Sequence, residues 1–298
     1  MRNWVGCLIT RPISGSVPKH DGAMYGYALN DIARSGVENM ALDQRMLEVA
    51  AERQCVMLRV YRWSEPTLSL GYFQPYTERW SHPPSSSIAV VRRATGGGAI
   101  VHHYDWTYCI AVPHIWEVRA EVSSPIGNHK IGSSQSLYDC IHDAVVQWLI
   151  SMGIDAQKWS QACALAADGK TERDKRAFLC FERRSCGDVV WGDQKVMGSA
   201  QRRIPGAVLQ HGSLLLAPSP HAPLLRGLDG ALDGPLDLAE GGTTRANTAE
   251  GFFKQLVCAV EMAGGIKMGE IKSLYEGPIN WKWPRATLFA ETCWTERR

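Results

Sequence analysis

The feature that most constrains the fold is a strand–turn–strand pattern inside residues 178–203. Asp188–Trp191 is a short apolar strand, and Gly192-Asp193 is a two-residue turn of the kind that joins antiparallel strands. The returning strand begins at Lys195 and runs into three residues with very little side chain: Gly198, Ser199 and Ala200. A backbone so bare allows a ligand to lie close against it. Lys195 is therefore either a cation aimed at an acyl or phosphate oxygen or an ordinary surface lysine of a hairpin.

A second glycine-rich element directly follows the predicted buried strand Ile88–Val91. It combines two arginines with three consecutive glycines: Arg92, Arg93, Ala94, Thr95, Gly96, Gly97 and Gly98. Backbone N–H groups without neighbouring side chains can point at an anion or a carbonyl oxygen, and arginine adds fixed donors. The spacing matches neither a Walker loop nor G-x-G-x-x-G. The pattern indicates a loop that cradles a ligand, with a bulge that needs a flexible backbone as the alternative.

The remaining chain alternates helical and strand-like segments, which predicts an α+β fold. Residues 1–35 are expected to be an extended lead-in, and residues 36–298 one catalytic domain whose helical tail begins at about residue 221. Residues 80–87, rich in proline and serine, are predicted to be a surface loop, and His142 is expected on a solvated helix face. We expect helices from Asn39 (the predicted N-cap), at Gly132–Ser151 and at Thr248–Ala263, and strands at Val56–Trp63, Thr67–Gly71, Trp106–Val112 and Val208–Leu216.

Composition excludes several functional classes. The net charge of +2 gives no electrostatic case for nucleic-acid binding. No apolar run approaches the roughly 20 residues of a membrane span, and the first residues lack the apolar core of a secretory signal. The nine cysteines are scattered without a C-x-x-C pair, so neither a metal site nor a disulfide framework is predicted. We expect a cytoplasmic protein in a reducing compartment.

Three motifs occur together in a recognisable order: RRATGGG at 92–98, KVMGSAQ at 195–201 and LQHGS at 209–213. In this combination the chain resembles the biotin/lipoate protein ligase superfamily, in the branch of the lipoate–protein ligases and octanoyltransferases, from about Asn39 to Leu216. The resemblance implies a class II biotin/lipoate ligase-like domain with antiparallel and mixed sheets flanked by helices. It also implies that Lys195, which stands where the family has its pocket lysine, binds the acyl carbonyl. The substrate-binding residues that it implies are Arg92, Arg93, Thr95, Gly96, Gly97, Gly98, His102, Gly198, Ser199, Ala200, Gln201 and His211.

Within this branch, the sequence is more similar to LipM-type octanoyltransferases than to the ligases. Those transferases carry a nucleophilic cysteine in a Cys-Phe pair fifteen residues before the pocket lysine, and Cys180-Phe181 stands at that distance from Lys195. Cys186 lacks the following phenylalanine and ranks behind. Thr107-Tyr108 and the closing residues 289–298 also look like the transferases. The chain departs from the family in having His102-His103 where His-Asp is common, Cys109 where serine is usual, and Glu-Arg-Arg-Ser after Cys180-Phe181.

The resemblance implies a two-step acyl transfer without cofactor or metal. Cys180 would accept the octanoyl group of octanoyl-acyl carrier protein, and the lysine of a lipoyl domain or of the glycine-cleavage H protein would then receive it. Lys195 would stabilise the thiolate and the oxyanion. The alternatives are a lipoate–protein ligase that uses ATP and Mg²⁺, a lipoyl amidotransferase, and a non-catalytic acyl-binding relative. We expect a monomer, with a basic rim for an acidic carrier protein at Arg183, Arg184, Arg202 and Arg203.

Overall fold

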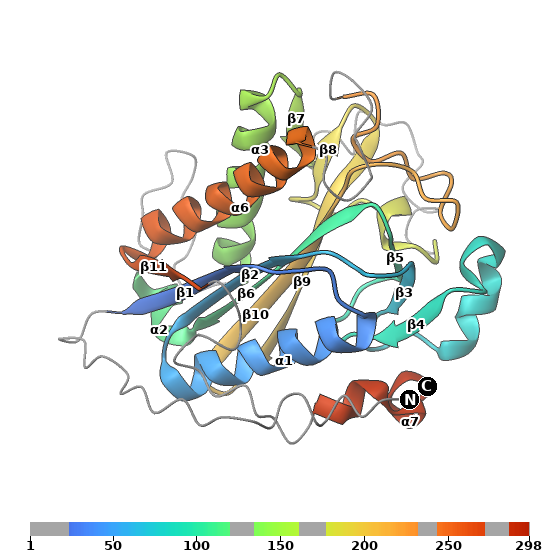
Figure 1. The fold of residues 1–298 in the computed structure, drawn as a ribbon, viewed down its shortest axis with the longest axis horizontal. Helices are drawn as coiled ribbons and strands as arrows, with labels where there is room; N and C mark the ends of the chain where they lie inside the picture. The colour runs from blue at the N-terminus through green and yellow to red at the C-terminus, as the bar shows by residue number, and fades with distance from the viewer. Residues whose placement is uncertain (1–23, 120–133, 161–176, 232–242, 272–285, 298) are drawn as a thin grey trace.

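The computed structural model describes residues 24–119, 134–160, 177–231, 243–271 and 286–297. Within these residues the chain forms a large sheet, a small sheet, and helices on both faces of the large one (Figure 1). The large sheet has the spatial order β11 (Lys267–Glu270), β1 (Tyr25–Asn30), β2 (Val56–Tyr61), β6 (Asp105–Pro113), β10 (Ala207–Leu215), β9 (Gln194–Ile204), β8 (Val189–Trp191) and β7 (Ala156–Lys158).

Strand directions make both sheets mixed. In the large sheet β1 is parallel to its neighbours β11 and β2, and the other pairs are antiparallel. In the small sheet β3 (Thr67–Leu70) lies between β4 (Ala89–Arg92), to which it is parallel, and β5 (Ile100–His102), to which it is antiparallel. The predicted α+β class with antiparallel and mixed sheets is confirmed.

The described helices are α1 (Gly36–Arg53), α2 (His114–Arg119), α3 (Ser134–Ser151), α6 (Thr243–Gly264) and α7 (Thr292–Thr295). Four short 3-10 helices accompany them in the described residues: η2 (Tyr76–Ser81), η3 (Pro83–Ser85), η4 (Cys180–Glu182) and η5 (Ala286–Ala290).

Helix α1 begins earlier than predicted. Ser35 is its N-cap and forms a capping box with Glu38, which satisfies free backbone donors at the helix start. Asn39, predicted to be the cap, lies inside the helix and is buried. Its amide nitrogen donates to the carbonyl oxygens of Arg34 and Arg62 and so ties α1 to the adjoining chain. The predicted cap was wrong because Asn39 serves the tertiary contact instead.

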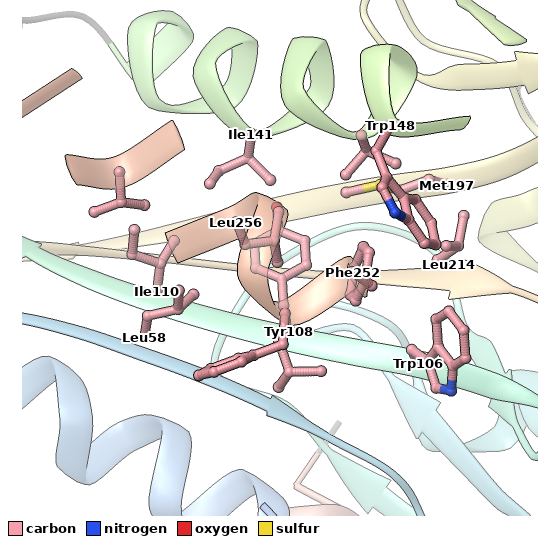
Figure 2. Close-up of a cluster of buried hydrophobic side chains, with 14 of the residues drawn as sticks. Leu58, Trp106, Tyr108, Ile110, Ile141, Trp148, Met197, Leu214, Phe252 and Leu256 are labelled. Atoms are coloured by element: carbon pink, nitrogen blue, oxygen red, sulfur yellow. The ribbon is translucent and has the colours of Figure 1, made fainter. Parts of the chain in front are cut away.

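Two hydrophobic clusters lie on opposite faces of the large sheet because side chains alternate along each strand. Along β6, Trp106, Tyr108 and Ile110 belong to the cluster under α3 and α6 (Figure 2), whereas Cys109 and Ala111 belong to the cluster under α1. Figure 1 shows α3 and α6 on one face and α1 on the other. The sheet is therefore the middle of three layers, and its strands carry side chains to both.

Three further expectations need correction. Residues 25–30 of the predicted lead-in form β1, a strand of the main sheet, while residues 1–23 lie outside the described residues. Much of the loop predicted at 80–87 is helical, because η2 and η3 occupy it. The predicted helical tail also contains a strand, β11, which pairs with β1.

Replacing Phe252 tests the layer between the sheet and the two helices. This α6 residue is fully buried between the rings of Trp106 and Trp148. Phe252→Ala removes most of that contact and leaves a cavity, so the free energy of unfolding should fall by about 3–5 kcal/mol. Urea denaturation measures this loss. Met262→Ala, on the same helix but 71% exposed, is the control and should change stability by less than about 0.5 kcal/mol.

Candidate active site

Cys180 sits at the start of η4, against the glycine loop. Its backbone nitrogen donates to the carbonyl oxygen of Ala99 at 2.7 Å, and the nitrogen of Ala99 donates to the carbonyl oxygen of Phe178 at 3.0 Å. Gly98 allows this approach, because a Cβ there would lie 3.1 Å from Cys180 N and from Phe178 O. The glycine at 98 thus brings the cysteine loop and the glycine loop together.

Lys195 lies beside this cysteine. Its Nζ is 3.8 Å from Cys180 Sγ and 3.5 Å from Cys180 O, and it lies 5.4 Å from the centroid of the Phe181 ring. A Cβ at Gly198 would come within 2.5 Å of Lys195 Cε, so the bare strand makes room for the lysine stem. The structure brings the two predicted catalytic side chains together, and their roles stay predictions.

Asp188 was missed as a site residue by the sequence reasoning, which read it only as the start of a strand. Its carboxylate pairs with Lys195 Nζ at 2.7 Å, and both side chains are almost fully buried. Tyr138 of α3 donates its hydroxyl to Asp188 Oδ1 at 2.9 Å, and the backbone nitrogen of Ser185 donates to Oδ2 at 2.7 Å. A carboxylate in the same hairpin as the lysine was the available signal. Tyr138 gave no signal in the sequence, because it lies 50 residues away from Asp188.

The two arginines of the glycine loop bind backbone carbonyl oxygens. Arg93 donates to the carbonyl oxygens of Ser69, Gly96 and Gly98. Burial lowers the pKa of its guanidinium to about 10, and the nearby Cys180 thiol partly offsets this. Arg92 donates to carbonyl oxygens on both sides of the loop, those of Gly71, Tyr72, Gln74 and Thr295. Arg93 therefore shapes the loop, and Arg92 joins it to residues 71–74 and to the C-terminal tail without lining the pocket.

A pocket opens between these elements. Its lining residues come from α1, both sheets and the cysteine loop: Met40, Tyr61, Trp63, Ser69, Arg93, Gly96, Gly97, Ile100, His102, Thr107, Cys180, Phe181, Gly198, Ser199, Ala200, His211, Gly212 and Ser213. Most predicted site residues are among them. Those that are not are Arg92, Thr95, Gly98, Lys195 and Gln201.

Thr95 does not line the pocket, but it supports His211, which does. Its Oγ1 is 2.6 Å from Nε2 of His211, and Nδ1 of the same histidine is 2.9 Å from Oδ2 of the buried Asp43. Because a carboxylate only accepts, Nδ1 carries the proton and Nε2 accepts from the threonine. Asp43 of α1 thus fixes the ring that forms one pocket wall.

His102 is buried in a second polar group of the pocket. Its Nδ1 lies 2.8 Å from Asp105, and its ring stacks on Trp63 at a centroid distance of 3.8 Å. Burial lowers the pKa of this histidine, although the adjacent Asp105 carboxylate opposes the shift. Gln201, by contrast, donates to Oε1 of Gln210 at 2.7 Å, on the strand next to its own.

His142 was predicted on a solvated helix face, and the structure contradicts this. The side chain is fully buried, because α3 turns it toward the sheet. Nδ1 lies 2.8 Å from the carbonyl oxygen of Gly187, which can only accept, so Nε2 accepts from Ser199 Oγ at 2.7 Å. Ser199 Oγ also lies 2.7 Å from the hydroxyl of Tyr108. Burial lowers the pKa of His142 to about 4, more than the Gly187 carbonyl raises it.

The protonation of His142 predicts a loss of stability in acid. Between pH 6.5 and pH 4 the unfolded chain binds a proton that the folded chain lacks, so folding weakens as pH falls through this window. The full shift corresponds to about 3 kcal/mol. His142→Gln should therefore lose less unfolding free energy than the parent between pH 7 and pH 4.5, measured by urea denaturation. His114→Gln, at an exposed position, should follow the parent, and parallel curves for all three would refute the assignment.

The position of Lys195 predicts that its ammonium increases the reactivity of Cys180. An ammonium 3.8 Å from sulfur stabilises a thiolate by Coulomb attraction. Lys195→Met combined with Asp188→Asn removes the ion pair without leaving a buried charge, and should slow iodoacetamide alkylation of Cys180 at pH 7 by about tenfold. Peptide mass spectrometry follows each cysteine separately. Cys186, exposed nearby, is the internal control, and an unchanged Cys180-to-Cys186 rate ratio would contradict a role for the lysine.

The described residues contain no group of three or more histidine, cysteine, aspartate or glutamate side chains arranged to hold a metal ion. None of their helices is both long enough and apolar enough to cross a membrane.

Comparison with known proteins gives matches of two kinds. A family model described as the lipoyl protein ligase A/B catalytic domain matches residues 35–228. Octanoyltransferase LipM of Carboxydothermus hydrogenoformans is 34% identical over 186 residues, which cover 61% of this chain and 61% of that protein. The Bacillus subtilis protein of the same name is 32% identical over 187 residues, covering 60% of each chain. The matched stretch thus spans about three fifths of these relatives.

A solved structure shows the same fold. The bi-partite lipoate protein ligase from Thermoplasma acidophilum, determined with its E2 lipoyl domain, aligns with a TM-score of 0.55 at 17% identity. The alignment covers 92% of this chain and 96% of that one. At this identity the likeness concerns the fold alone.

Proposed function

The chain belongs to the lipoyl protein ligase A/B catalytic-domain family, and from that premise we propose that it is a cysteine-dependent octanoyltransferase of protein lipoylation. The observation that carries the proposal is the pairing of Cys180 Sγ with Lys195 Nζ at 3.8 Å, with the cysteine in the wall of the pocket. The similarity to proteins named octanoyltransferase LipM supports the choice of acyl group and reaction.

In the first step the thiolate of Cys180 attacks the thioester carbon of octanoyl-acyl carrier protein. A bond forms between Sγ and the acyl carbon, the carrier's carbon–sulfur bond breaks, and the carrier thiol leaves with a proton. Negative charge develops on the acyl oxygen in between. The ammonium of Lys195, held by Asp188 at 2.7 Å, is a cation beside the sulfur that can stabilise that oxyanion.

In the second step the amine of an acceptor lysine, on a lipoyl domain or the glycine-cleavage H protein, attacks the Cys180 thioester. An amide forms, the amine loses its proton, and the cysteine sulfur leaves. No cofactor or metal is required. The largely apolar lining of the pocket, with Met40, Ile100 and Phe181, suits an aliphatic acyl chain. We propose that the reaction takes place in the cytoplasm with a monomeric enzyme.

The arrangement of the glycine loop favours the transferase over an ATP-dependent ligase. In a ligase this loop would receive nucleotide phosphates. Here the guanidinium groups of Arg92 and Arg93 donate to backbone carbonyl oxygens. These guanidinium groups are thereby engaged away from a triphosphate.

Intact-mass spectrometry tests the proposal. The protein is incubated with octanoyl-acyl carrier protein in the absence of ATP, and an octanoyl adduct is expected on the parent and on Cys186→Ala but not on Cys180→Ala. Transfer to a lipoyl domain should fall in parallel by at least about 10³-fold in Cys180→Ala, because the covalent intermediate is lost.

Other outcomes identify the alternatives. Modification that requires lipoate and ATP, with release of pyrophosphate and no loss in Cys180→Ala, would make the protein a ligase. An adduct formed faster from octanoyl H protein than from the acyl carrier protein would make it an amidotransferase. Acyl binding without any transfer would leave a non-catalytic acyl-binding protein.

A further inference from the structure

The pocket face of β9 continues beyond the pocket. Gly198, Ala200 and Arg202 pair with Ser213, His211 and Leu209 of β10, respectively. Since side chains alternate along a strand, these three β9 residues project from one face. Gly198 and Ala200 line the pocket. Arg202 is therefore the next side chain on the floor that leads away from Cys180.

Arg202 reaches the outer side of the glycine loop. Its Nη1 donates to the carbonyl oxygen of Ala94 at 3.1 Å, and its Cζ lies 5.2 Å from the centroid of the Tyr72 ring. The backbone nitrogen of Tyr72 donates to the carbonyl oxygen of Thr95 at 2.8 Å, so the ring is fixed to the same loop. Nε of Arg202 has no hydrogen-bond partner among the described residues.

A second guanidinium, from the C-terminal tail, shares this ring. Cζ of Arg297 lies 3.8 Å from the centroid of Tyr72 and 3.8 Å from that of Trp294, so the group is held between two aromatic rings. Trp294 in turn donates its indole N–H to the carbonyl oxygen of Arg92 at 2.9 Å. Nε and Nη2 of Arg297 lack hydrogen-bond partners among the described residues.

The two guanidiniums both lie near the Tyr72 ring, without an acidic partner among the described residues. No carboxylate of the described residues forms an ion pair with Arg202 or Arg297. Placing two like charges on one ring is unfavourable, and buried N–H groups without acceptors add a cost. An anion that accepts from both arginines removes both penalties, and the planar guanidinium fork matches phosphate oxygens.

We propose that Arg202 and Arg297 form a phosphate subsite at the pocket mouth, which binds the phosphodiester of the phosphopantetheine arm that presents the octanoyl thioester. This inference rests on the proposed function. The side chain of Lys195 lies against Gly198, which is four strand residues from Arg202, and Lys195 itself is seven residues from Arg202. At the rise of a β-strand these separations correspond to roughly 13 Å and 23 Å, which bracket the distance from the Lys195 ammonium to the proposed subsite. The thirteen bonds between sulfur and phosphorus of the arm extend to roughly 16 Å, inside that interval.

Small-molecule donors test the subsite without any carrier-protein surface. Octanoyl-phosphopantetheine and octanoyl-pantetheine differ only in the phosphate, and the rate of Cys180 acylation from each is followed by intact mass. The parent should prefer the phosphorylated donor by about tenfold or more in kcat/KM, and Arg202→Gln and Arg297→Gln should each lose most of that preference. Because the preference is a ratio of two rates on the same variant, a general change in activity cancels from it, and acylation of each variant by octanoyl-pantetheine shows that its site is folded.

Arg53→Gln is the matched control, because it removes the same charge at the exposed end of α1, and it should keep the full preference. Equal rates for both donors on the parent, with normal acylation of Cys180, would overturn the subsite and leave the proposed function intact. Acylation from octanoyl-acyl carrier protein but from neither small donor would also overturn the subsite alone, whereas acylation from none of the three donors would overturn both. If the two arginine variants instead weakened ATP-dependent adenylate formation while donor preference stayed unchanged, the phosphate bound there would belong to a nucleotide, and the proposal would fall.

Discussion

The buried ammonium of Lys195 is the constraint on which the site depends. A charge with so little access to water is tolerated only when a counter-ion and hydrogen bonds replace its hydration. Asp188 supplies the charge, and Tyr138 and the backbone of Ser185 complete the carboxylate's hydrogen bonds. The β8–β9 hairpin, the cysteine loop and α3 must therefore meet at one point. That meeting point also places the ammonium 3.8 Å from Cys180 Sγ.

The glycine loop is held by a different interaction, the bonding of arginine to backbone carbonyl oxygens. Arg93 binds two carbonyl oxygens within the loop and a third on β3, and Arg92 joins the loop to residues 71–74 and to Thr295 in the C-terminal tail. A loop built largely of glycine has little side-chain packing to fix it, so these charge-assisted bonds define its shape. The tail thereby becomes part of the site, although it lies more than a hundred residues away in sequence.

Two histidines support the pocket from opposite faces of the sheet. His211 is oriented by Asp43 of α1, and His142 of α3 accepts from Ser199 on the pocket floor. His211 bridges Asp43 of α1 to Thr95 of the glycine loop, and His142 bridges the carbonyl oxygen of Gly187 to Ser199. Hydrogen bonds from α1 and from α3 thus reach the pocket from the two faces of the sheet.

The hairpin around Gly192-Asp193, the glycine loop, the α+β class and the pairing of Cys180 with Lys195 could be predicted from the sequence, because turn chemistry, periodicity and motif order are local properties of the chain. The sequence analysis misplaced His142 and passed over Asp188, Tyr138 and Arg297. The environment of those residues depends on partners that folding brings close: Tyr138 meets a carboxylate 50 positions away, and His142 meets the Ser199 hydroxyl 57 positions away. Burial and pairing of charges depend on which layers pack together, so only the tertiary structure could decide them.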